Sequence, residues 1–158
     1  MTRAIVFILA VFLGSAAFAA DGSATEGTVL ERWEADRTQV FDAAEVDLEA
    51  LRWVARPVIV FANTEANPAF QEQLELLSER TEELAERDVI LITDTSPEGR
   101  SALRTKLRPR GFQLTLIGKD GGVKLRKPFP WDVRELTRQI DKMPLRQQEI
   151  RDALRAGE

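Results

Sequence analysis

The stretch Pro57-Val58-Ile59-Val60-Phe61-Ala62 is the most informative part of this sequence of 158 residues. It is apolar at every position, so neither of the two faces that alternate along a strand carries a polar side chain. A strand of this kind is buried by helices on both faces of a sheet. The stretch therefore predicts a central strand in an α/β domain.

Helical and strand patterns alternate on the C-terminal side of this stretch. Asn67-Pro68 predicts a helix start, because asparagine is a preferred N-cap and proline fits the first helical position. Apolar residues at helical spacing continue that helix to Arg87. The remaining patterns predict a strand over 89–92, a helix from Ser96-Pro97 to Pro109, a strand over 112–117, a turn over 118–122, a strand over 123–126, and helices after Asp132 and from Pro144.

The order of these elements predicts the topology of the sheet. A strand–helix–strand crossover joins parallel strands, whereas a hairpin joins antiparallel ones. The sequence therefore predicts a mixed four-stranded sheet with helices on both faces, in the order of the thioredoxin-like α/β core. We place this domain at residues 47–158 and predict a flexible acidic leader over residues 20–46. Apolar residues are sparse over residues 29–46, and this part of the leader either stays loose or docks on the domain.

The residue types missing from the sequence exclude several chemistries. It contains no cysteine and no histidine, which excludes thiol redox reactions, Ser-His-Asp or Cys-His nucleophiles, and thiolate or imidazole metal sites. The thioredoxin-like fold carries its thiol after the first core strand, here residues 62–68, and a cis-proline before the third, here residues 111–113. This sequence has neither. We predict no thiol oxidoreductase or peroxidase activity, no metal and no cofactor.

The N-terminus has the features of a secretory signal peptide. Arg3 supplies a positive charge, Ala4 to Leu13 form an uncharged apolar run, and Ala17-Phe18-Ala19 matches the small-x-small cleavage pattern. The apolar run is shorter than the roughly 20 residues of a membrane-spanning helix. We therefore predict cleavage after Ala19, no stable membrane anchor after cleavage and, for a Gram-negative source, a periplasmic location.

Charge is divided unevenly along the chain, although the formal net charge is only −4. Residues 21–99 contain 19 acids and 6 bases, whereas residues 100–127 contain 9 bases and 1 acid. One interpretation is an anion-binding face. The other is that these cations stabilise a helix C-terminus, protect an edge strand and balance the acidic helix. The candidate binding residues are Arg56, Arg110, Lys119, Lys124, Arg126 and Arg146.

Three of the larger side chains have structural alternatives. Trp53 precedes the central strand, so we expect it in the core. The guanidinium groups of Arg56 and Arg146 could clamp an anionic ligand, because a guanidinium binds carboxylate or phosphate in two-pronged geometry. Alternatively, they form structural ion pairs at the junction of secondary-structure elements, with Asp88, Asp94 or Asp141.

Several motifs resemble a known family of exported bacterial proteins. These motifs are Leu51 to Ala62, Gln71, Glu86 to Val89, the hairpin Leu116 to Arg126, and the ending Ile140 to Arg146. Together they are similar to the domain of unknown function 4174 family over about Asp47 to Arg151. The resemblance implies a small exported domain with a thioredoxin- or peroxiredoxin-like fold, and it brings no catalytic residues with it.

The sequence thus predicts an exported, non-catalytic binding or protein-interaction module. Its expected partner is an envelope protein or an anionic envelope component. Nucleic acid is not expected, because the chain is acidic and its basic stretch lacks interleaved aromatic residues. The alternative is a carboxylate-based enzyme that uses Asp94, Asp120 or Glu65 as acid or base. That alternative requires two of these carboxylates to converge in one pocket.

Overall fold

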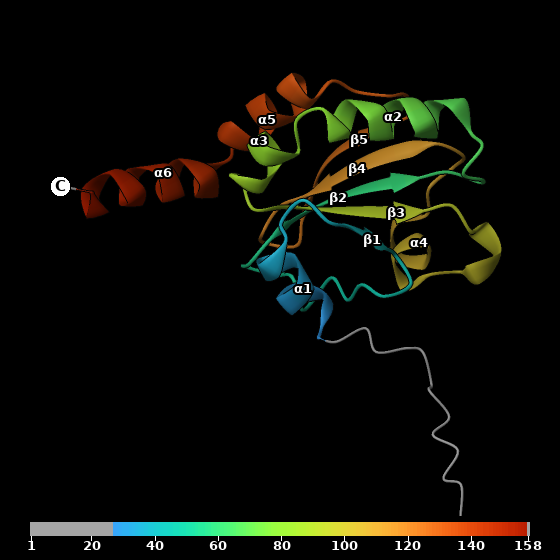
Figure 1. The fold of residues 1–158 in the computed structure, drawn as a ribbon, viewed down its shortest axis with the longest axis horizontal. Helices are drawn as coiled ribbons and strands as arrows, with labels where there is room; N and C mark the ends of the chain where they lie inside the picture. Colours follow the sequence, from blue (N-terminus) through green and yellow to red (C-terminus); the bar gives the residue numbers. More distant parts are fainter. Residues whose placement is uncertain (1–26, 158) are drawn as a thin grey trace, which may run out of the picture.

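The protein is a mixed α/β domain in which one five-stranded sheet is covered by helices on both faces (Figure 1). The computed structural model describes residues 27–157. The predicted signal peptide over residues 1–19, its cleavage after Ala19 and the first part of the leader lie outside these residues. The predicted fold class is confirmed.

The sheet has the strand order β1-β3-β2-β4-β5. Its central strand, β2 (Arg56–Phe61), pairs in parallel with β3 (Val89–Asp94) and antiparallel with β4 (Gln113–Ile117). The edge strands are β5 (Val123–Lys127), antiparallel to β4, and β1 (Val40–Asp42), parallel to β3. All six residues of β2 are buried: Pro57 to Phe61 as their apolar pattern predicts, and Arg56 although it is charged.

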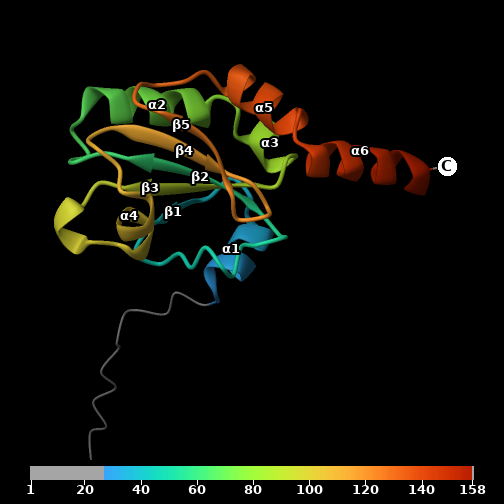
Figure 2. The same ribbon diagram turned by 180° about the vertical axis from the view of Figure 1, so that it is seen from behind.

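Alternate side chains of β2 enter two separate cores. Val58 and Val60 pack under α2 (Pro68–Ser78), α3 (Thr81–Ala85) and α5 (Val133–Asp141), while Ile59 and Phe61 pack against α1 (Val29–Ala35) and α4 (Ala102–Leu107). Each element thus buries one apolar face against the sheet. Figures 1 and 2 show these helix layers on opposite faces of the sheet.

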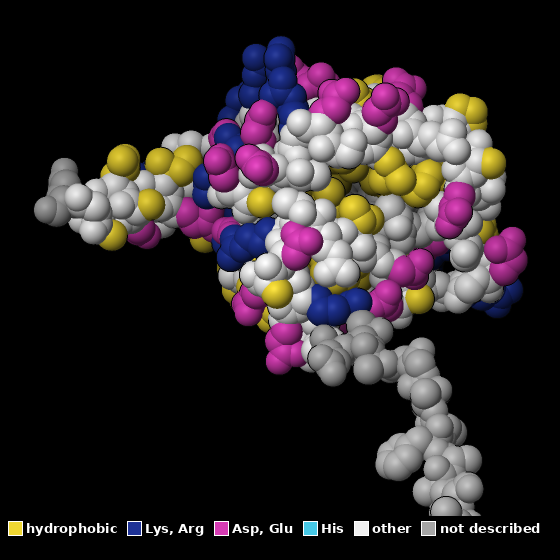
Figure 3. All heavy atoms as spheres, in the orientation of Figure 1, with side chains coloured by type: hydrophobic (Ala, Val, Ile, Leu, Met, Phe, Trp, Pro, Cys, Tyr) yellow, Lys and Arg dark blue, Asp and Glu magenta, His cyan; other side chains and the backbone are white. Residues whose placement is uncertain are grey.

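The last helix, α6 (Pro144–Ala156), projects away from the body of the domain (Figures 1 and 2). None of its residues is buried, and Leu154 near its end is 69% exposed. Figure 3 shows apolar side chains lying open along this arm. Within residues 27–157, no helix combines the length and apolar character that crossing a membrane requires.

The sequence analysis was wrong about the number of strands and about a flexible leader up to residue 46; the structure shows the alternative in which residues 29–46 dock on the domain. Residues 29–46 form α1 and the fifth strand, β1, rather than a flexible segment. Trp33 is 1% exposed, and its indole N–H donates to the carbonyl of Val89 over 3.2 Å. Phe41 is likewise buried. A few apolar residues are enough here because Trp33 and Phe41 are large and fully buried against the sheet. The sequence pattern did not show β1, because a strand of three residues is too short for a visible alternation.

Two predicted helices are each divided. The helix expected from Asn67 to Arg87 stops at Ser78, because Arg80 (φ −140°, ψ 35°) leaves the helical region before α3 begins. The helix expected from Ser96 is a short 3₁₀ turn, η1 (Pro97–Gly99), followed by α4, which Ser101 caps. Both divisions follow the tertiary packing, since the second segment turns to bury its own leucines.

We expect Trp33→Ala to lower the free energy of unfolding by about 3–5 kcal/mol, because it empties a large buried site and removes a hydrogen bond. Urea unfolding followed by circular dichroism measures this loss. Glu34→Ala, at an exposed position of the same helix, is the matched control and should stay within about 0.5 kcal/mol of the parent chain. Equal stability of the two variants would contradict the packing of residues 29–46 against the sheet.

Candidate functional site

A thioredoxin-like fold carries its thiol at the carboxyl ends of the central strands. In this chain a buried ion pair occupies the carboxyl ends of β2 and β3. Asp94, at the end of β3, is 4% exposed and accepts hydrogen bonds from Arg104 (2.7 Å) and from the Ser101 hydroxyl (2.5 Å). Arg104 also donates to the carbonyl of Ala62, the residue after β2 (2.8 Å). These polar groups satisfy one another, so the cluster holds the ends of β2 and β3 together.

The three candidate carboxylates do not converge. Glu65 is exposed after β2, beside a shallow groove of about 410 Å³ between β1 and α2 (Figure 3). Asp94 is paired with Arg104 at the same end of the sheet. Asp120 lies at the opposite end, because it follows β4, which runs antiparallel to β2. No two of them line a common pocket, so the condition set for a carboxylate-based enzyme is not met.

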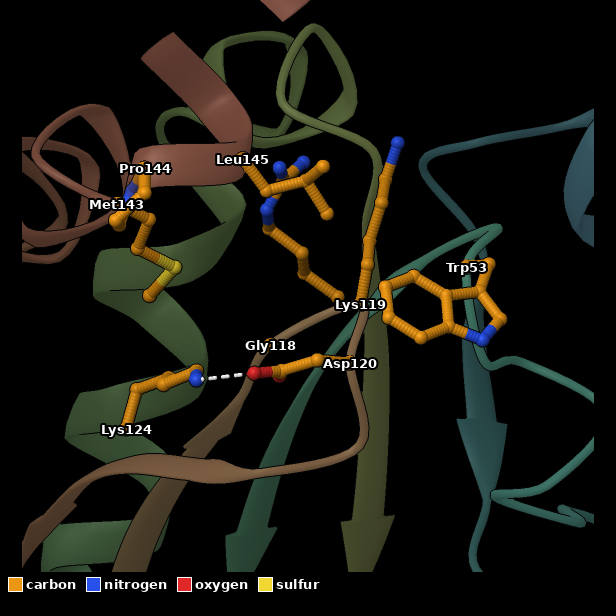
Figure 4. Close-up of a pocket in the computed structure, with 9 residues that line it drawn as sticks. Trp53, Gly118, Lys119, Asp120, Lys124, Met143, Pro144 and Leu145 are labelled. Carbon is orange, nitrogen blue, oxygen red and sulfur yellow. Dashed lines mark hydrogen bonds and ion pairs between the residues drawn. The ribbon is translucent and has the colours of Figure 1, made fainter. Parts of the chain in front are cut away.

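A pocket of about 330 Å³ lies at this opposite end of the sheet, beside the start of α6 (Figure 4). We call it the Trp53 pocket. It brings together three of the predicted binding residues, Arg56, Lys119 and Lys124. Its full lining is Trp53, Arg56, Gly118, Lys119, Asp120, Lys124, Met143, Pro144 and Leu145.

The tight turn between β4 and β5 shapes one side of this pocket. Lys124 pairs with Asp120 over 2.5 Å, and this hydrogen bond lowers the pKa of the Asp120 carboxyl. A Cβ atom on Gly118 would lie 2.5 Å from Cε of Lys124. A larger residue at this position would require the Lys124 and Asp120 side chains to shift. The hairpin signal in the sequence marks this turn, but not its role as a pocket wall.

A network of ion pairs lies behind the pocket. Arg56 is 1% exposed, and its guanidinium donates to Glu149 (2.9 Å) and to the carbonyl of Arg87 (2.9 Å). Lys119 pairs with Asp88 (2.7 Å) and Glu149 (2.9 Å). The structural ion pairs considered for Arg56 are therefore present, with Asp88 at 3.9 Å and Glu149 as the closer partner.

Arg146 belongs to the same network, although it does not line the pocket. It lies 3.4 Å from Glu149 and 3.7 Å from Asp141, on the first turns of α6. The two remaining candidates lie outside the pocket: Arg126 donates to the carbonyl of Leu107 at the end of α4 (2.6 Å), and Arg110 is exposed after α4. The basic residues of segment 100–127 are thus divided between different parts of the domain.

Trp53 is the residue that the sequence analysis placed wrongly. It is 63% exposed and has a backbone φ of 65°, in the left-handed region that disfavours bulky residues. Its backbone N–H donates to the carbonyl of Lys119 over 2.7 Å. The chain turns several times between Asp47 and Val54, so proximity to a buried strand does not bring this side chain into the core.

The apolar residues from α6 were also missed. Met143, Pro144 and Leu145 line the pocket opposite Trp53 (Figure 4). They lie some 90 residues away from Trp53 in the sequence, and no local pattern links them. They meet because Glu149, one turn further along α6, is held by Arg56 and Lys119.

Comparison with solved structures defines the class of fold. Thioredoxin peroxidase I of Plasmodium yoelii is similar with a TM-score of 0.54 and 16% identity, over 66% of this chain and 81% of that one. The reduced 2-Cys peroxiredoxin of Plasmodium vivax is similar with a TM-score of 0.53 and 14% identity, over 65% and 85%. At these identities the likeness shows the thioredoxin-like, peroxiredoxin-like fold alone.

The family follows from the sequence itself. Residues 47–149 match the family described as domain of unknown function (DUF4174), and the chain belongs to that family. No curated protein matches the sequence. The matched region contains the whole Trp53 pocket but begins after α1 and β1, which complete the sheet.

We expect Glu149→Gln to lower the free energy of unfolding by about 2 kcal/mol at pH 7, because charge-assisted hydrogen bonds from two cations are weakened. Burial raises the pKa of Glu149, but the hydrogen bonds from Arg56 and Lys119 together lower it below its ordinary value. A lowered pKa in the folded state stabilises the fold above the unfolded-state pKa of about 4.3, and this stabilisation is lost as the pH falls through the folded-state pKa.

The difference between the parent chain and Glu149→Gln should therefore shrink as the pH falls from about 5 to 3. Urea unfolding at a series of pH values measures it. Asp152→Asn, whose partner Arg155 is exposed on the outer part of α6, is the control and should show little difference at any pH. A difference that stayed constant down to pH 3 would contradict the assignment to the Glu149 carboxylate.

Proposed function

We propose that this chain is an exported, non-catalytic binding module and that the Trp53 pocket is its binding site. One observation carries the proposal: a large aromatic side chain is held in an unfavourable backbone conformation and is mostly exposed at the pocket. A left-handed conformation costs an ordinary residue roughly 1–2 kcal/mol. Such strain clusters at binding and catalytic sites, where the surrounding structure maintains it.

The Trp53 side chain does not contribute to the hydrophobic core, and its aromatic ring lies beside the exposed Arg52. Its ring is out of the core, and its one backbone hydrogen bond would be kept by any residue other than proline. Tryptophan is enriched where proteins bind their partners, because it offers a large rigid surface with little entropy to lose. The same pocket also contains apolar side chains from α6 and cations from β2 and the hairpin.

A non-catalytic role is supported by what the sequence and the geometry offer for chemistry. The sequence has no cysteine or histidine. Glu65 and Asp94 lie at one end of the sheet and Asp120 at the other, and Asp94 and Asp120 each have a cationic partner. Among residues 27–157, no three metal-ligating side chains come together at a possible metal site. The alternative of a carboxylate-based enzyme has no observation in its favour.

Export and the partner complete the proposal. The charged start, short apolar run and Ala17-Phe18-Ala19 motif support cleavage and a periplasmic location. In that compartment the partner is an envelope protein or an anionic envelope component. The cations of the pocket support an anionic group on the partner.

Export predicts that the chain recovered from the periplasmic fraction of expressing cells begins at Ala20. Mass spectrometry of the intact protein and N-terminal sequencing measure this directly. A matched variant with Ala17→Asp and Ala19→Asp should accumulate uncleaved, because signal peptidase needs small residues at those positions. A parent chain that kept Met1 in the cytoplasmic fraction would contradict export.

If the pocket is the binding site, Trp53→Gly should reduce binding without lowering the stability of the fold. Glycine adopts a positive φ freely, so we expect the variant to gain about 0.5–1 kcal/mol of stability after its own entropic cost. It should also lose its partner. A photo-crosslinking residue at exposed Arg52, beside Trp53, should capture a partner in cells, and Trp53→Gly should reduce the captured fraction at least about tenfold.

The matched control carries the same photo-crosslinking residue at exposed Glu72 on α2, away from the pocket. Capture from position 72 should be weak and should not respond to Trp53→Gly. If capture from position 52 is unchanged in the stable Trp53→Gly variant, the pocket is not the binding site.

A further inference from the structure

The walls of the Trp53 pocket suit an apolar group. Figure 4 shows the indole of Trp53 on one side and Met143 and Pro144, at the start of α6, on the other. Leu145, which also lines the pocket, is 37% exposed. Large apolar side chains left open around a concavity favour a ligand that covers them, since burial of apolar surface drives association.

The size of the pocket favours a small molecule. Its volume of about 330 Å³ lies at the lower end of the range of roughly 300–1,000 Å³ that is typical of small-molecule sites. Such a site combines apolar walls with a few polar groups that orient the ligand. The charged residues of the lining are three cations, Arg56, Lys119 and Lys124, and one carboxylate, Asp120.

The ion pairs behind the pocket leave one positive charge in excess. Residues within 4.0 Å of an oppositely charged partner form one connected network beside Lys119. Its members are the five cations Arg37, Arg56, Arg87, Lys119 and Arg146 and the four carboxylates Glu86, Asp88, Asp141 and Glu149. Lys124 and Asp120 form a separate neutral pair. A ligand with a single negative charge would complete this balance.

Hydrogen-bond donors for such a charge remain at the pocket. An ammonium group has three N–H donors. Lys119 uses two, toward Asp88 and Glu149, and Lys124 uses one, toward Asp120, among the acceptors of residues 27–157. The Lys119 side chain is only 11% exposed, so a hydrogen bond to it would be little screened by water. Figure 4 shows the Lys119 and Lys124 ammonium groups pointing in different directions, so Lys124, beside Asp120, is the lysine that can donate to a carboxylate in the pocket.

We propose that the Trp53 pocket binds a small molecule with an apolar body and one carboxylate group. The apolar body lies between Trp53 and the start of α6, and the carboxylate accepts a hydrogen bond from Lys124. The proposal rests on the function proposed above, because it names the ligand of the same pocket. A phosphate dianion fits less well, since it exceeds the single charge that the network leaves uncompensated.

Three small probes test this assignment by nuclear magnetic resonance. They are 3-phenylpropanoate, its neutral amide 3-phenylpropanamide, and acetate, which has the charge without the apolar body. The chain has three tryptophans, so its indole N–H groups give three resonances, and Trp53 reports on the pocket while buried Trp33 does not. We expect 3-phenylpropanoate to shift the Trp53 resonance and to bind at least about tenfold more tightly than the amide, with no shift by acetate.

Two lysine variants locate the carboxylate. Lys124→Gln removes a pocket cation whose side chain is 35% exposed, and it should abolish most of the preference for the acid over the amide. Lys127→Gln is the matched control on the same strand. Lys127 lies over the Trp131 ring outside the pocket, so this variant should keep the full preference.

The outcomes separate this proposal from the function on which it rests. Equal affinity for acid and amide would overturn the carboxylate assignment and leave the pocket as an apolar binding site. No shift by any probe would overturn the small-molecule assignment, while crosslinking from position 52 independently tests the pocket as a binding site. A peptide with a C-terminal phenylalanine that bound at least tenfold more tightly than 3-phenylpropanoate would assign the pocket to a protein chain end instead.

Discussion

Neither face of strand β2 is in contact with solvent, and the helices and neighbouring strands are arranged so that both faces are covered. Its residues alternate between two apolar cores, so the domain needs helices on both sides and a hydrogen-bonded neighbour at each edge. The polar residue at its start, Arg56, is buried with the strand. A buried guanidinium must be paired, and its pairing holds α6 beside the sheet and so creates the pocket.

The two ends of this sheet have different roles. At the carboxyl end of β2 and β3, Asp94, Ser101 and Arg104 form hydrogen bonds with one another. At the opposite end, the network around Lys119 is held together by the carboxylates but retains an excess cation next to an apolar cavity. This chain thus has the architecture of a peroxiredoxin-like domain, while its candidate site lies at the other end of the sheet from the position where that fold carries a thiol.

Part of the candidate site could be predicted from the sequence. Lys119 and Lys124 are predicted because cations are conspicuous after a long acidic stretch, and Arg56 because a guanidinium can clamp an anion. All three line the same pocket. Trp53 was assigned to the core because it is apolar and precedes the central strand. Its left-handed backbone conformation, which accompanies an exposed side chain, has no signal in the local sequence. Met143 and Leu145 carried no signal, since they reach the pocket only through the docking of α6. Residues 29–46 were taken as flexible because their few apolar residues show no period.

The sequence by itself determined the α/β fold class, the order of the core strands and the loss of thiol chemistry. These features depend on local periodicity and on residue types, and both can be read directly from the sequence. Tertiary structure alone decided the fifth strand, the exposure of Trp53 and the meeting of the hairpin with α6. Each of these depends on contacts between residues far apart in the chain, and their geometry is set by packing and by the pairing of buried charges.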